Sequence, residues 1–143
     1  MKLSTKMRYE TRAMVDLAQH YEQGLVSARE VAERQQVSAK YLEQLLTTLR
    51  SAGLVRSVRG AQGGQQLARP PSQINLREIY NIFEGVQEFA ECATCPQICD
   101  RTELCVTQDI WSQMYDACMK VLESTTLEDL VLRAKESQTE KIL

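Results

Sequence analysis

The sequence predicts a mainly α-helical protein, a winged helix-turn-helix with a small β-hairpin wing and a long C-terminal dimerisation helix. Three patterns predict this fold: two short helices joined by a tight turn in residues 27–51, a glycine-tipped hairpin in residues 54–67, and a long amphipathic helix in residues 106–124. The chain has 143 residues, of which 43% are hydrophobic and 6% aromatic. This size suits one domain with a modest core, extended by an element that associates with another chain.

The first helix is expected over residues 5–23. Ser4 is a suitable N-cap, and Gly24 closes the pattern. The apolar positions form a stripe that must face a core: Met7, Met14, Leu17, Ala18 and Tyr21. Four basic residues mark the beginning of the helix: Lys2, Lys6, Arg8 and Arg12. Such a basic end suits either a nearby DNA backbone or a solvated surface, and His20 is interpreted as an ordinary, partly buried side chain.

The second and third helices form the helix-turn-helix. Ser27 and Glu30 make a capping box for a helix that ends near Gln35. Ser38 caps the next helix, which Gly53 ends. Four leucines make its apolar stripe: Leu42, Leu45, Leu46 and Leu49. Its polar residues can contact phosphates or read base edges in a major groove, and these DNA-binding candidates are Ser38, Lys40, Tyr41, Gln44, Thr47 and Thr48.

The wing is expected where residues 54–58 and 65–67 pair as strands. Between them lies a six-residue tip, Arg59 to Gly64, with three glycines. Glycine backbone such as that of Gly60 can approach a sugar-phosphate wall closely, and Arg59 can enter a narrow minor groove. An ordinary solvated hairpin is the alternative, but the helix-turn-helix before it favours contact with DNA.

Charge is polarised along the chain, although the net charge is only −2. Residues 1–71 hold 11 Lys and Arg against 6 Asp and Glu, whereas residues 72–143 hold 6 against 13. A basic first half followed by an acidic second half fits a nucleic-acid module joined to a region that stays off the phosphates. No apolar run approaches the ~20 residues of a membrane span and no signal peptide opens the chain, so we expect a cytoplasmic protein.

The second half begins with a fourth helix over residues 76–83, capped by Asn75 and stopped by Gly85. The helix over residues 106–124 would be ~28 Å long, too long for so small a core to cover its stripe, so we expect it to pack on its twin. Intramolecular packing is the alternative. Thr125 or Thr126 caps a last short helix. The expected units are 1–85 for DNA binding, 86–105 as a cysteine-rich loop, 106–134 for dimerisation, and a polar tail at 135–143.

Four of the five cysteines lie within 14 residues: Cys92, Cys95, Cys99 and Cys105. A cytoplasmic chain would not use them as a permanent disulfide staple, so metal binding or redox sensing is expected. Thiolates suit an iron-sulfur cluster, although the spacing differs from the common ferredoxin runs. Zinc at a C-x-x-C half-site, a thiol-disulfide switch and inert cysteines are the alternatives. A thiol oxidoreductase is disfavoured because Pro96 follows and no βαβ pattern exists, and no other catalytic constellation can be assembled.

Several runs resemble one family. These are the opening Met1–Lys6 with Arg8-Tyr9, the run Ser38–Leu45, Gly53–Val55, Val58–Gly60 and Gly63-Gly64. Together they resemble the Rrf2 family of winged-helix transcription regulators, over nearly the whole chain to about Leu132. Members include regulators of iron-sulfur assembly and cysteine metabolism and a nitric-oxide sensor. The resemblance implies a homodimer that binds pseudo-palindromic operators, usually as a repressor, and in many members three loop cysteines hold a cluster.

The resemblance also implies roles for single residues. Tyr41, Glu43 and Gln44 match base-reading positions, and Arg59 matches the wing arginine of the minor groove. The three cluster positions match Cys92, Cys99 and Cys105. One departure is in the wing, where the family often has an aromatic residue after Gly63-Gly64 and this chain has Gln65 and Gln66, which predicts weaker wing packing.

The fourth cluster ligand is left open by the resemblance. Some relatives use a histidine where this chain has Gln108, and others use a carboxylate from the partner's first helix where it has Arg8. Cys95 is the local candidate, and the others are a partner Glu10, Cys118 or an open site. We expect a homodimeric DNA-binding regulator with a 2Fe-2S or 4Fe-4S cluster that purification can remove. A protein partner, zinc or thiol oxidation without a cluster is the alternative control.

Overall fold

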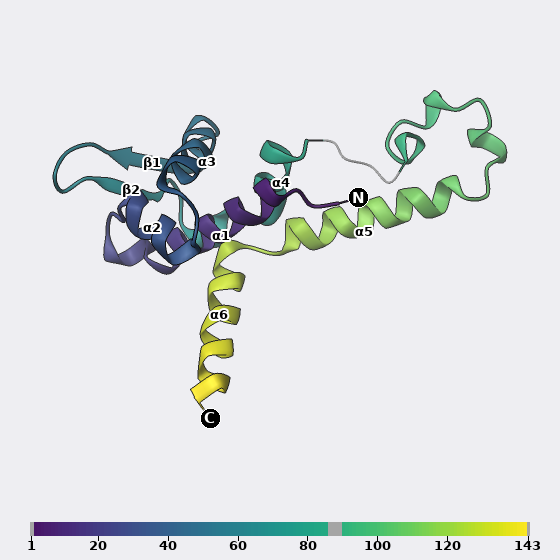
Figure 1. Cartoon of the computed structure of the whole chain (residues 1–143). Coiled ribbons are helices and arrows are strands. Elements are labelled where there is room, and N and C mark those ends of the chain that lie inside the picture. Colours follow the sequence, from purple (N-terminus) through teal and green to yellow (C-terminus); the bar gives the residue numbers. More distant parts are fainter. Residues whose placement is uncertain (1, 86–89, 143) are drawn as a thin grey trace.

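A computed structural model of the chain describes residues 2–85 and 90–142 (Figure 1), with side chains through residue 139. The described residues are mainly helical with one two-stranded sheet. Their helices and strands are α1 Thr5–Gln19, α2 Ala28–Gln35, α3 Ala39–Ser51, β1 Val55–Val58, β2 Gly64–Leu67, α4 Leu76–Phe83, α5 Gln108–Ser124 and α6 Leu127–Ile142. Short 3₁₀ turns lie at Tyr21–Gln23, Pro71–Gln73, Glu91–Ala93, Pro96–Ile98 and Thr102–Leu104.

Helix α1 runs through the centre of the compact region of the molecule (Figure 1). Ser4 caps it by accepting a hydrogen bond from the Met7 N–H at 3.0 Å. Met14 and Leu17 are fully buried against the leucines of α3 and residues of α2 and α4. The helix ends at Gln19 rather than near residue 23, and a 3₁₀ turn follows before Gly24. The predicted first helix is therefore split into two pieces.

The turn between α2 and α3 is tight and built from local hydrogen bonds. The Ser27 capping box is present, as predicted. Gln36 adopts a left-handed conformation, with φ of 56°, and the Val37 N–H donates to the Ala32 carbonyl at 3.0 Å. Ser38 then caps α3 by accepting from the Tyr41 N–H. These bonds fix the direction in which α3 leaves α2.

Strands β1 and β2 form the predicted antiparallel wing, which projects from the compact region (Figure 1). The register pairs Val55 with Leu67 and Val58 with Gly64. Gly63 is required at the tip, because a Cβ there would lie 2.1 Å from the Val58 carbonyl oxygen. The buried pair Val55 and Leu67 ties the base of the wing to the core.

Helix α4 connects the core to the C-terminal helices. Asn75 and Glu78 form a second capping box, and Gly85, with φ of 63°, follows the helix. The Leu76 N–H donates to the Thr125 carbonyl at 2.9 Å, and the Leu127 N–H donates to the Ile74 carbonyl at 2.9 Å. The corner between α5 and α6 is thereby held by backbone bonds to the segment before α4.

Helices α5 and α6 project from the core in different directions (Figure 1). Helix α5 has a single buried residue, Met119, within its 17 residues. Helix α6 packs on α1 through Leu127 and Val131, and it runs to Ile142. The prediction of a short last helix and a polar tail from residue 135 was wrong, because the tail contains good helix formers that extend an anchored helix. No helix in the described residues is long and apolar enough to cross a membrane.

Candidate DNA-binding surface and cysteine loop

The polar residues predicted to bind DNA lie together on the outer face of α3. Its four leucines are all buried. Lys40, Glu43 and Gln44 are exposed, and Tyr41 and Thr48 are partly exposed. Ser38 is exposed while its hydroxyl accepts the Tyr41 N–H at 3.1 Å, which leaves the hydroxyl proton for an outside acceptor. Helix α3 therefore presents a continuous polar surface next to the wing.

Tyr41 is held by aromatic contact with α1. Its ring lies 6.0 Å from the Tyr9 ring in an edge-to-face arrangement, and the Arg12 guanidinium lies 5.3 Å from the Tyr9 centroid. Partial burial, followed by the nearby Glu10 carboxyl, raises the pKa of Tyr41. The Tyr41 hydroxyl therefore remains a hydrogen-bond donor at neutral pH.

Beneath Tyr41, Glu10 is a buried carboxyl. Its side chain has 0% exposure, and neither oxygen has a hydrogen-bond partner within the described residues. Burial raises the pKa of Glu10 to about 8, Lys6 lowers it and Glu84 raises it. Glu10 is therefore enclosed within its own chain and exposes no carboxylate oxygen on the surface of that chain.

The wing tip presents Arg59 and Gly60 to solvent. Both residues are exposed, and Gly60 has a φ of 115°, in the region that favours glycine. Within residues 2–85 and 90–142, the Arg59 guanidinium makes no hydrogen bond or ion pair. The arginine predicted for a minor groove is therefore free to reach a ligand beyond the tip.

The cysteine segment, residues 90–105, lies at the N-terminal end of α5, and its first 3₁₀ turn packs against that helix (Figure 1). All five cysteines of the chain are free thiols; Cys95 and Cys99 are exposed, and Cys92 and Cys105 are half-buried. Thr102 Oγ1 donates to the carbonyls of Pro96 at 2.6 Å and Cys99 at 2.8 Å, which closes one turn. In the stretches of the chain that the structure describes, no three acidic, histidine or cysteine side chains converge as for a metal ion.

Comparison with known proteins settles the family. The sequence model of the Rrf2 family, described as an iron-dependent transcriptional regulator, matches residues 3–133. The chain belongs to the Rrf2 family. Protein rrf2 of Nitratidesulfovibrio vulgaris is 38% identical over 131 residues, covering 92% of this chain and 87% of that protein.

Two solved structures of Rrf2-family regulators share the fold. The structure of T. potens IscR is 43% identical, with a TM-score of 0.78, and covers 96% of this chain and 91% of that one. The structure of CymR, the global cysteine regulator of B. subtilis, is 37% identical, with a TM-score of 0.76, and covers 93% and 98%. The predicted winged helix-turn-helix and the predicted family are confirmed, and this Rrf2-family chain is a transcriptional regulator rather than an enzyme.

The donor set of the cysteine segment suits a soft metal centre in its chemistry, although the thiols stand apart. The pKa of the Cys105 thiol is lowered, first by its hydrogen bond with the Thr107 hydroxyl at 3.3 Å and then by backbone N–H groups. Thiolate is the form that binds metal or reacts. The thiols that the segment offers to such a centre are those of Cys92, Cys95, Cys99 and Cys105.

Gln108 has a structural role in this Rrf2-family regulator. Its Nε2 donates to the Cys92 carbonyl and to Ser112 Oγ, each at 3.0 Å, and Ser112 Oγ donates to the Ala93 carbonyl at 3.0 Å. These bonds fasten the Cys92 turn to the first turns of α5. Cys118 lies ten residues further along α5, away from the segment.

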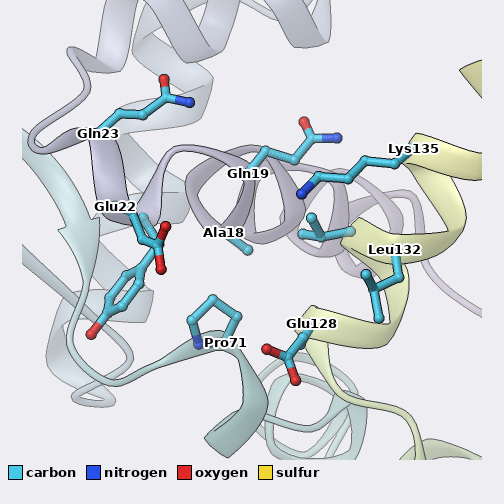
Figure 2. A pocket seen from close by; sticks show the side chains of 10 residues that line it. Ala18, Gln19, Glu22, Gln23, Pro71, Glu128, Leu132 and Lys135 are labelled. Carbon is cyan, nitrogen blue, oxygen red and sulfur yellow. The ribbon is translucent and has the colours of Figure 1, made fainter.

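A pocket of about 300 Å³ lies between the end of α1 and α6 (Figure 2). The charged side chains of Glu22, Glu128 and Lys135 stand around it.

Sequence reasoning missed three features of this surface. It missed the burial of Glu10, the contact of Gln108 with Cys92, and a contact between Arg50 of α3 and Gln65 of β2 at 3.2 Å. Gln65 departs from the family pattern in a way that predicts weaker wing packing, yet its side chain is buried and hydrogen-bonded. The available signal for this contact was strand alternation, which places Gln65 on the same face of β2 as the core residue Leu67.

Proposed function

We propose that this regulator is a homodimeric repressor that binds a pseudo-palindromic operator, and that the state of its cysteine segment sets its affinity. The observation that carries the proposal is the polar face of α3, with Ser38, Lys40, Tyr41, Glu43, Gln44 and Thr48, beside the exposed Arg59 and Gly60 of the wing. In this arrangement α3 would enter a major groove and the wing would reach the adjacent minor groove.

The homodimer is supported by the exposed apolar face of α5. Large side chains there are open to solvent: Ile110, at 48% exposure, Met114, at 39%, and Val121, at 63%. Leu3, Ala117, Cys118, Val121 and Leu122 line a shallow apolar groove along the same helix. Exposed apolar stripes of this length favour association, and a two-fold dimer would present two copies of α3 to two half-sites.

An iron-sulfur cluster is the proposed cofactor of the segment. Cys92, Cys99 and Cys105 would hold it, with Cys95 as the candidate fourth ligand, because Gln108 is engaged with the Cys92 carbonyl and Glu10 is buried. A bound cluster would supply sensitivity to iron and to oxidants. The chain's own contribution is the link from Gln108 and Ser112 to the backbone at residues 92 and 93. Any rearrangement of the segment would act on the start of α5, and so on the spacing of the two α3 helices.

The experiment begins with protein purified without oxygen, as wild type and as Cys95→Ala. Visible absorption with iron and acid-labile sulfide would support the cluster, and its loss in the variant would support Cys95 as fourth ligand. The DNA probe is a site selected by the wild type from a random duplex library. Affinities that are equal for cluster-loaded and cluster-free dimers would contradict cluster control.

Thiol oxidation without a cluster is the second candidate for control. It is favoured by the lowered pKa of Cys105 and by the exposure of Cys95 and Cys99. Iron-free protein whose affinity changes with a peroxide, and recovers with a dithiol, would support it. Zinc content, or a change of affinity that appears only with an added protein partner, would point to the remaining alternatives.

A further inference from the structure

Gln65 is a buried polar residue of the wing. Its exposure is 8%, and it lies in β2, one residue after Gly64. The Gln65 N–H donates to the Val26 carbonyl at 2.7 Å, and the Val26 N–H donates to the Gln65 carbonyl at 2.9 Å. These two bonds fix the backbone of residue 65 against the segment that precedes α2. The position of the Gln65 Cα is therefore fixed by the backbone of Val26 and not by the wing tip.

The Gln65 side chain contacts α3 through Arg50. Arg50 Nη1 donates to Gln65 Oε1 at 3.2 Å, and Arg50 Nη2 donates to Thr47 Oγ1 at 2.8 Å. The same Nη2 lies 3.8 Å from Glu43 Oε2. A guanidinium is planar and its donors point in fixed directions. Gln65 and Thr47 therefore hold the guanidinium at two points, with its Nη2 at ion-pair distance from Glu43.

Glu43 is the residue at the end of this chain of contacts, and its side chain is 51% exposed. An ionised carboxylate accepts hydrogen bonds and donates none, so in a major groove it can pair with an amino group such as cytosine N4. Phosphates on both walls of the groove repel it. The positive charge of Arg50, 3.8 Å from the Glu43 carboxylate, offsets some of this repulsion.

Resting on the DNA-binding role proposed above, we propose that Gln65 is a specificity-determining positioning residue. It touches no DNA itself. By holding Arg50, it fixes Glu43 on the outer face of α3 and thereby sets the base preference at one position of each half-site. The expected preference at that position is a C·G pair, with the cytosine amino group facing Glu43.

The test is selection from a random duplex library by the wild-type protein, followed by titration of the selected site with each base pair at every position. Glu43→Ala identifies the position that Glu43 reads. Gln65→Leu, which keeps the volume and removes the acceptor, should lower the discrimination at that same position by about three- to tenfold. Discrimination elsewhere should be unchanged. Gln65→Glu keeps an acceptor for Arg50 and should retain the preference.

Two comparisons separate positioning from general damage. In the Glu43→Ala background, Gln65→Leu should have no further effect at the position, because the two residues act through one contact. Gln66→Leu is the matched control: the same change one residue later, on the opposite face of β2, where the amide faces Arg56. It should leave discrimination at the Glu43 position intact. Thermal melting confirms that each variant is folded, and Arg50→Met tests the same link should Gln65→Leu unfold.

The ways in which the test can fail are distinguishable. A wild type that selects no sequence would overturn the DNA-binding proposal itself. A wild type that selects a site, with a profile that Gln65→Leu and Arg50→Met leave unchanged, would overturn the positioning role alone. A loss of affinity spread evenly over all positions would also overturn it, because weaker wing packing would have that effect.

Discussion

Residues 2–85, which carry the surface proposed to read DNA and are called the reading domain below, and the cysteine segment, residues 90–105, are held together by different means. In the reading domain, α3 rests on four leucines, of which Leu46 has 0% exposure. In the cysteine segment, Leu104 has 89% exposure, and short 3₁₀ turns with hydrogen bonds from Thr102 hold the chain. Apolar burial makes the reading domain a single cooperative unit, whereas the cysteine segment can change shape without disturbing that unit. A cooperative, rigid unit suits the proposed reading of DNA, and a segment that can change shape suits the proposed sensing.

The largest expected effect comes from replacing a buried leucine of α3 by a smaller residue. Leu46→Ala should lower the free energy of unfolding by about 2–5 kcal/mol, because it removes fully buried methyl groups and leaves a cavity. Urea unfolding followed by circular dichroism measures the change. Leu104→Ala makes the same chemical change in the cysteine segment and should alter stability by less than about 0.5 kcal/mol. Similar losses in the two variants would contradict the division between the two regions.

A second prediction concerns a weak point inside the reading domain, the buried Glu10. Its pKa in the folded protein, about 8, lies above the ordinary value of 4.5, so between these values the folded state holds a proton that the unfolded state has released. The free energy of unfolding should therefore fall with rising pH from about 4.5 to about 8, by up to about 1.4 kcal/mol per pH unit, and level off above.

Glu10→Gln should remove this slope, which urea titrations from pH 5 to pH 9 would show. Glu33→Gln, at an exposed position of α2, is the control and should keep the slope. A wild-type stability that is flat from pH 5 to pH 8 would mean that Glu10 finds a partner.

The wing tip should matter for affinity and not for folding. Arg59→Ala removes an exposed side chain, so the stability should stay within about 0.5 kcal/mol of wild type. Affinity for the selected duplex should drop by about 5- to 30-fold, with a loss of preference for A·T pairs next to the half-site. Fluorescence anisotropy on A·T-flanked and G·C-flanked duplexes measures both. Unchanged binding to both duplexes would remove Arg59 from the interface.

The smallest expected effect is at the link between the cysteine segment and α5. Gln108→Ala removes the bonds to the Cys92 carbonyl and Ser112 and should cost about 0.5–1 kcal/mol locally. Amide hydrogen exchange should speed up at residues 91–95 while the reading domain stays protected. Gln113→Ala, which removes an exposed bond to Asp109, is the control. Faster exchange throughout α3 would show that the two regions are not separable.

The features of the fold that could be predicted from the sequence are those that local chemistry determines. The caps at Ser4, Ser27, Ser38 and Asn75, and the leucine stripe of α3, specify helix starts and buried faces within a few residues of each other. The DNA-facing surface follows, because it is what remains exposed on α3 and the wing.

The rest depends on partners distant in sequence. Gln65 and Arg50 are 15 residues apart, and Gln108 and Cys92 are 16 apart, so no periodicity could indicate either contact. The burial of Glu10 breaks the rule that charged residues stay outside, and only the packing of α1 against its neighbours reveals it. The length of α6 was missed because the polar composition of residues 135–143 was interpreted as a tail that follows a short helix.

The corner between α5 and α6 has a mechanical consequence. It is pinned to the segment before α4 by the bonds at Leu76 and Leu127, while the other end of α5 carries the cysteine segment. Helix α5 has 17 residues and is about 25 Å long, and its C-terminal end is the one fixed to the reading domain. A tilt of α5 by about 5° about its fixed end would move its N-terminal end, next to the cysteine segment, by about 2 Å. The same coupling acts in reverse. If an operator holds the two reading domains at one separation, it also favours one arrangement of the thiols. By reciprocity, DNA would then be an effector of the sensor, and a regulator bound to its operator would respond to its signal at a different threshold from one in free solution.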